Sequence, residues 1–121
     1  MRENIIKEKT FDLAVNVVNL CRELAIKKNE FVLSNQLLKS GTSIGANTRE
    51  ALNAESEKDF IHKFSISQKE TNETIYWLDL LEATGLIDKE KYNQLIDKCK
   101  QIYKIITSII LTKKRNLRDN S

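Results

Sequence analysis

Apolar residues recur at intervals of three and four along most of this chain, a spacing that places them on one face of a helix. Four segments carry the pattern, over about residues 5–28, 34–54, 58–83 and 88–112, and a basic tail occupies residues 113–121. The connections between the segments are short, and no internal repeat or linker interrupts them. The pattern therefore predicts an all-α protein, folded over residues 1–121 as a single up-down four-helix bundle.

Short polar side chains mark where the predicted helices begin, since their oxygens accept hydrogen bonds from free amide groups in the first turn. The expected caps are Thr10, Ser34, Ser56 and Asp88. A lead-in from Ile5 precedes the first of them, Asp59 gives the third the spacing of a capping box, and Gly85 is expected to end the third helix. No glycine or proline separates the second helix from the third, so a single kink or a short loop is expected there.

The second helix is built from small residues where the others carry bulky apolar ones. Gly41 and Gly45 lie four residues apart on its apolar side, together with Leu37 and Ile44. Glycines placed there remove side chains from the contact surface, so that a neighbouring backbone can approach closely. A tightly packed helix is the favoured interpretation, and a loop followed by a short helix is the alternative.

The third helix has polar residues at inward positions between Phe64 and Ile75, namely Ser67, Gln68, Thr71 and Asn72. We expect them to form a hydrogen-bonded layer with polar residues of the second helix, across two helices or two subunits. The residues expected on the second helix are Ser40, Ser43, Asn47 and Glu50.

Longer apolar stripes define the first and fourth helices. The stripe of the first is predicted to comprise Phe11, Ala14, Val18, Cys21, Leu24 and Ala25. The stripe of the fourth is wider than the arc of about 100° that contact with one core requires. Its additional residues Tyr103, Ile105 and Ile110 predict contact with a second partner as well as with the core.

The composition changes this picture little. The chain has no proline, 31% charged and 40% hydrophobic residues, and no apolar run of about 20 residues, so a cytoplasmic helical protein is expected. Cys21 and Cys99 fall on predicted apolar faces and are interpreted as small hydrophobic residues, with a disulfide or a two-cysteine metal site as the alternative. His62 is the only histidine, which leaves most zinc arrangements without ligands.

Several ordered motifs carry a family resemblance. The segment QLLKSGTSIGANTREA, followed by SEKDFIHKFSISQKETNETIYWLDLLEATGLI, resembles the bacterial four-helix-bundle family of proteins encoded within intervening sequences of 23S ribosomal RNA genes. The matching motifs are Ser43-Ile44-Gly45-Ala46-Asn47, Arg49-Glu50-Ala51, Asp59-Phe60, and Lys69-Glu70 through Asn72-Glu73 to Tyr76-Trp77-Leu78. The resemblance covers residues 10 to 110, with departures at Lys39, Thr48 and Thr71.

The resemblance implies a homopentameric barrel of four-helix subunits, S23-like in type. It also implies a relationship to the accessory variability protein that assists the reverse transcriptase of diversity-generating retroelements. For that relative, the implied activity is binding of nucleic acid and of the reverse transcriptase. For most members of the family, the function is unknown.

An enzyme is not expected. A carboxylate-bridged di-iron bundle needs two Glu-x-x-His pairs, and this chain offers one histidine in Asp59-x-x-His62. No nucleophile paired with a base, phosphate-binding glycine loop or metal-ligand set is apparent, so no catalytic residue, cofactor or metal is predicted. Glu70 and Glu73 are interpreted as forming ion pairs with Lys39, Arg49 and Lys69, and acid-base catalysis by these two carboxylates is the alternative.

The residues predicted to make helix or subunit contacts are Gly41, Ser43, Gly45, Asn47, Glu50, Glu70, Glu73 and Trp77. Trp77 with Tyr76 is alternatively a platform on which bases stack, although aromatic rings at helical spacing are more often core or subunit contacts.

Positive charge is concentrated in the last quarter of the chain. Residues 1–88 hold 11 Lys and Arg against 14 Asp and Glu, whereas residues 89–121 hold 9 against 3, within an overall net charge of +3. The predicted nucleic-acid contacts are Lys98, Lys100, Lys104, Lys113, Lys114, Arg115 and Arg118. The leading hypothesis is a non-enzymatic, self-associating helical scaffold that binds structured RNA or DNA through this surface. The alternative is an adaptor that docks on a protein such as a reverse transcriptase, with the basic tail only keeping the protein soluble.

Overall fold

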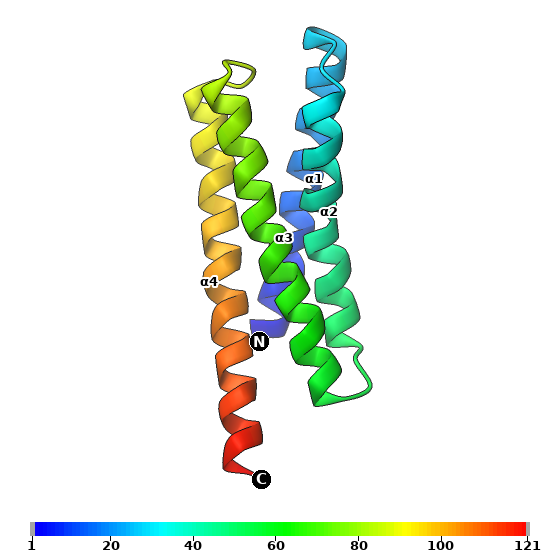
Figure 1. Cartoon of the computed structure of the whole chain (residues 1–121), viewed down its shortest axis with the longest axis vertical. Helices are drawn as coiled ribbons and strands as arrows, with labels where there is room; N and C mark the ends of the chain where they lie inside the picture. The colour runs from blue at the N-terminus through cyan, green and yellow to red at the C-terminus, as the bar shows by residue number, and fades with distance from the viewer. Residues whose placement is uncertain (1, 121) are drawn as a thin grey trace.

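The computed structural model describes residues 2–120, and within them the chain forms four helices and no strand. These are α1 (Arg2–Lys28), α2 (Val32–Leu52), α3 (Glu57–Ala83) and α4 (Lys89–Asp119). Each helix packs against the next, and α4 returns to α1, so that the four close a ring around one core. Successive helices run in opposite directions (Figure 1), and the predicted four-helix bundle is therefore confirmed.

Three predicted helix signals act as expected because their chemistry is local. Ser56 Oγ accepts a hydrogen bond from the Asp59 amide at 3.0 Å, and Asp88 Oδ1 accepts one from the Lys91 amide at 2.8 Å. Gly85 follows α3 with a φ of 77°, a left-handed conformation that costs glycine little. These residues fix the start of α3, the start of α4 and the turn between them.

The other two predicted caps are wrong. Thr10 lies inside α1, which begins eight residues earlier, and its hydroxyl donates to the carbonyl of Ile6 at 2.8 Å. Ser34 lies inside α2 and donates in the same way to the carbonyl of Glu30. The Glu30 carboxylate instead accepts the hydrogen bond from the Leu33 amide. Serine and threonine can bond backward to their own helix, so their presence alone does not mark a helix start.

The chain between α2 and α3 is a short turn over residues 53–56, so of the two predicted alternatives the short loop is confirmed and the kink is wrong. The end of the fourth helix differs from the sequence prediction, because residues 113–119, predicted as a tail, continue α4 to Asp119. The end of α4 therefore projects beyond the end of the bundle where α1 begins (Figure 1).

The core-facing stripe of α1 is rotated from its predicted position. Phe11 is 56% exposed, while the buried face carries Ile6, Leu13, Val17, Leu20 and Leu24. Ile6, Leu13 and Val17 follow one another at intervals of seven and four residues on one face of α1, and Phe11 falls on another face. On α4, Ile110 is buried in the core, whereas Tyr103 and Ile105 are half-buried, and contact of this stripe with a second partner stays a prediction.

A buried layer of hydroxyl groups, here called the hydroxyl layer, joins α2 to α3. Its members, all fully buried, are Ser40, Thr48, Ser67, Thr71 and Thr74. Ser67 Oγ donates to the carbonyl of Ile44 at 3.0 Å and lies 3.2 Å from Thr48 Oγ1, and Thr74 Oγ1 donates to Ser40 Oγ at 3.0 Å. Because the side chains are small and satisfied in pairs, the two helices approach closely without leaving polar atoms unpaired.

Part of the predicted polar layer lies elsewhere. Gln68 donates to Thr107 Oγ1 of α4 at 2.8 Å, and Asn72 is exposed. Asn47 donates within α2 to Ser43, and Glu50 pairs with Lys63 at the surface. The layer therefore connects two helices of one chain.

The two cysteines are free and buried. Cys21 Sγ donates to the carbonyl of Ser34 at 3.2 Å, which ties α1 to the start of α2. Burial raises the pKa of Cys21 to about 11 and that of Cys99 to about 12. Within residues 2–120, no helix has the length and apolarity needed to cross a membrane.

Candidate nucleic-acid interface

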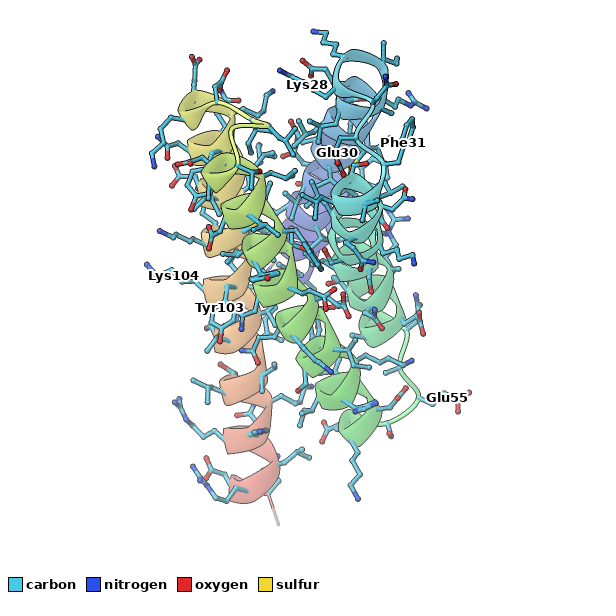
Figure 2. All side chains as sticks on the ribbon, turned by 45° about the horizontal axis from the view of Figure 1, so that its top comes forward. Lys28, Glu30, Phe31, Glu55, Tyr103 and Lys104 are labelled. Atoms are coloured by element: carbon cyan, nitrogen blue, oxygen red, sulfur yellow. The ribbon has the colours of Figure 1, made fainter. Side chains whose placement is uncertain are left out.

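One side of α4 is rich in cations. The sequence from Lys98 to Arg118 contains seven Lys and Arg residues and no Asp or Glu. Five of them are exposed, namely Lys100, Lys104, Lys114, Arg115 and Arg118. At 100° per residue the first four fall within an arc of about 100°, on the side of α4 that faces away from its buried isoleucines. Figure 2 shows Lys104 projecting from α4 away from the other helices.

The remaining predicted cations have other surroundings. Lys98 Nζ lies 2.6 Å from Asp12 Oδ2 of α1. Lys113 Nζ lies 3.8 Å from Glu57 Oε1 and 4.7 Å from the centre of the Phe60 ring. Arg118 is exposed near the end of the helix. The fold thus distinguishes exposed cations of α4 from Lys98 and Lys113, which bridge α4 to its neighbours.

Two cations of α1 join the same surface, and sequence reasoning missed both. Arg2 Nη1 donates to Ser108 Oγ at 2.6 Å, and Lys9 Nζ donates to Gln101 Oε1 at 2.9 Å. Neither partner is charged, so the positive charges stay available to an anion. We call Arg2, Lys9, Lys100, Lys104, Lys114 and Arg115 the basic face. The seven-residue spacing of Arg2 and Lys9 places them on one side of a helix, but which helix lies beside them is a tertiary property.

Carboxylates bound the basic face at its ends. Along α4, Asp97 lies one turn before Lys100 and Asp119 lies one turn after Arg115. None of Lys100, Lys104, Lys114 and Arg115 forms an ion pair among the described residues. Along α4 the strip is therefore positive with acidic limits, whereas on α1 Glu3 lies beside Arg2 and Asp12 lies beside Lys9.

The predicted contact glycines both face α1. A Cβ atom added to Gly41 would lie 2.9 Å from both Cγ atoms of Val17, closer than real side chains approach. A Cβ atom added to Gly45 would lie 3.5 Å from the carbonyl oxygen of Thr10, an ordinary contact. The close approach is therefore between α2 and α1, and Gly41 is the residue that permits it.

The other predicted contact residues lie along the outer side of α2 and α3. Ser43 and Asn47 bond to each other, and Glu50 Oε1 accepts a hydrogen bond from Lys63 Nζ at 2.9 Å. Glu73 is exposed and Glu70 is half-buried. The pKa of Glu70 is raised, mainly by its burial and to a smaller extent by the negative charge of Glu73. Within residues 2–120, the carboxylate of neither residue forms a hydrogen bond or ion pair.

Trp77 is half-buried beside this side of α3. Its indole nitrogen has no hydrogen-bond partner within residues 2–120, and its ring meets that of Tyr76 edge-on at 5.0 Å. Tyr76 is exposed, as are Lys39, Lys69 and His62. Arg49 of α2 points toward α1, where its guanidinium lies 5.3 Å from the centre of the Phe11 ring.

An open cleft of about 290 Å³ lies at the end of the bundle where α1 ends, between α1 and the turn that joins α3 to α4. Its floor includes Leu20, Leu24 and Ile87. Its rim carries both signs of charge, including Glu23, Lys27, Lys28, Asp88 and Lys91. In the described part of the chain, no three metal-ligating side chains converge, either there or elsewhere.

Comparison with known proteins decides the family. The family model described as "23S rRNA-intervening sequence protein" matches residues 2–108. The chain belongs to this family. The resemblance carried by its motifs is thereby confirmed, and the family's four-helix bundle is the fold that the structure has.

A solved relative extends the comparison. It is the crystal structure of a protein with unknown function from the S23 ribosomal protein family of Bacteroides thetaiotaomicron VPI-5482. The two chains are 48% identical with a TM-score of 0.90, over 91% of this chain and 98% of the other. No curated protein matches this chain. Membership of the 23S rRNA-intervening sequence family thus fixes the fold, while the relative carries no assigned activity.

Proposed function

We propose that this protein is a non-enzymatic, homo-oligomeric helical scaffold that binds structured RNA or DNA through the basic face. The observation that supports the proposal is the exposed, unpaired row of Lys100, Lys104, Lys114 and Arg115 on one side of α4. Arg2 and Lys9 widen this row across the contact with α1.

Phosphates are the natural ligands of such a row. Each Lys or Arg that neutralises a phosphate releases condensed counterions, which drives binding without base recognition. In the homopentamer that the family resemblance implies, the face would recur five times. Repeated faces on one long nucleic acid would add avidity to weak individual contacts.

The experiment is fluorescence anisotropy of a labelled structured RNA with nuclease-treated protein, across a salt series. Binding should weaken linearly in log salt. The variant with Lys100, Lys104, Lys114 and Arg115 all changed to alanine should reduce the slope by about 3, because each phosphate contributes about 0.7 to 0.9. Absence of binding at low salt would refute the proposal.

A matched control separates the basic face from net charge. Lys7, Arg22, Lys28 and Lys39 are exposed, carry the same total charge and lie on α1 and α2. Changing these four to alanine should leave the salt slope unchanged. Equal loss in the two quadruple variants would mean that any cation serves, and the assignment of the face would be wrong.

The adaptor alternative has an observation in its favour. Large apolar side chains are exposed on α1 and the start of α2, including Ile26 at 82% and Val32 at 74%. Phe11 is exposed on α1, and Phe31 is exposed immediately before α2. Exposed apolar area of this kind is typical of protein contact.

Sedimentation of the wild type tests the self-association part of the proposal. A mass above that of one chain is the result expected for a scaffold. A single-chain mass together with capture of a reverse transcriptase that survives alanine substitution of the basic face would favour the adaptor.

A further inference from the structure

The basic face is long and rigid. Lys100 and Arg115 are fifteen positions apart on one continuous helix, which is about 22 Å along its axis. The pair Lys100 and Lys104 and the pair Lys114 and Arg115 have midpoints about 19 Å apart. Arg2 and Lys9 lie beside Ser108 and Gln101, at intermediate heights. The helix thus fixes the spacing of the backbone positions that carry these cations.

A double helix matches such a row better than a flexible strand does. Duplex DNA carries one charge per about 1.7 Å of axis, so about 13 phosphates lie along 22 Å. It is straight over this distance, since its persistence length is about 500 Å. A groove of about 12 Å has a phosphate backbone on each side, so the two pairs of cations are far enough apart to meet both backbones. An unpaired strand would first have to be ordered, which costs binding free energy.

The basic face also lacks what surfaces for unpaired strands use. Those surfaces combine cations with aromatic rings on which bases stack. The two rings of α4, those of Tyr92 and Tyr103, are half-buried. The exposed rings of Phe11, Phe31 and Tyr76 lie on α1, in the turn before α2 and on α3, and Arg49 stacks on the ring of Phe11.

We infer that the basic face recognises double-stranded nucleic acid in preference to an unpaired strand, through both phosphate backbones beside one groove. The inference rests on the proposed function and specifies its ligand. It assigns Lys100 and Lys104 to one backbone and Lys114 and Arg115 to the other.

The test compares three probes of about 20 nucleotides per strand: duplex RNA, duplex DNA and oligouridine. At one salt concentration, both duplexes should bind at least about tenfold more tightly than oligouridine. The variants Lys100→Ala with Lys104→Ala, and Lys114→Ala with Arg115→Ala, should each reduce the salt slope for duplex DNA by about 2. Tyr103→Leu should leave all three affinities unchanged.

The outcomes distinguish failure of this inference from failure of the proposed function on which it rests. Oligouridine binding as tight as duplex binding would overturn the inference and leave the phosphate-binding scaffold in place. A loss of oligouridine affinity in Tyr103→Leu that exceeds the loss for duplexes would also overturn it, because stacking would then contribute. Failure to bind any of the three probes at low salt would overturn both.

Discussion

Gly41 and Gly45 give a paired test of the contact between α1 and α2. Replacing either glycine by alanine adds one methyl group to the same helix and improves helix propensity by about 1 kcal/mol. The surroundings differ. At Gly41 the new Cβ would lie 2.9 Å from both methyl carbons of Val17, and at Gly45 it would lie 3.5 Å from the nearest backbone atom.

The expected effects therefore have opposite signs. Val17 is fully buried, and a β-branched side chain has little rotamer freedom, so Gly41→Ala must displace the backbone or strain the core. Overpacking of this kind costs about 1–3 kcal/mol, which leaves a net loss of about 0–2 kcal/mol after the propensity gain. Gly45→Ala should stabilise by up to about 1 kcal/mol. The difference between the two variants isolates overpacking, because the propensity term is common to both.

Urea unfolding followed by circular dichroism measures both variants, at one protein concentration because self-association changes apparent stability. Val17→Ala should relieve the strain, so the double variant with Gly41→Ala should show a favourable coupling on the order of 1 kcal/mol. If Gly41→Ala stabilises the protein as much as Gly45→Ala does, the close approach of α1 and α2 at Gly41 is refuted.

Three further predictions concern buried polar groups. Ser67→Ala should cost about 1–3 kcal/mol in urea unfolding, since it leaves buried partners unsatisfied, whereas Ser65→Ala, which loses only a bond to its own helix, should cost less. Because burial raises the pKa of Glu70, its contribution to stability is present at low pH and lost as the pH rises through the folded-state pKa. Glu70→Gln should therefore raise the melting temperature at neutral pH, and an advantage that grows on acidification would contradict this reasoning. Cys21 and Cys99 should resist a thiol reagent at neutral pH in the folded protein and react fully in guanidinium, and rapid labelling of either folded thiol would contradict its burial.

Much of the fold could be read from the sequence because its signals are local. Ser56, Asp88 and Gly85 act through atoms within a few residues, so their roles follow from residue type and spacing. Thr10 and Ser34 have the same chemistry but bond backward inside longer helices. Residue type alone does not separate these two uses of a hydroxyl, which is why two helix starts were misplaced.

The candidate interface was less readable for a different reason. The seven cations from Lys98 to Arg118 can be counted in the sequence, but whether each forms an ion pair depends on residues far away along the chain. Lys98 meets Asp12 across 86 positions, and Lys113 meets Glu57 on another helix. Arg2 was counted in the acidic part of the chain, although the fold places it beside Ser108. Charge counts locate a basic segment, and tertiary contacts decide which of its charges face solvent.

The contact between α1 and α4 is the least extensive of the four in the ring, and it carries the polar pairs of Arg2, Lys9 and Lys98. Amide hydrogens of α1 should therefore exchange with deuterated solvent sooner than those of α2 and α3, which the hydroxyl layer holds together. The basic face straddles this same contact. A polyanion bound there would join the first helix to the last, so its arrival should register as slowed deuterium uptake in α1, a helix that supplies only two of the six cations.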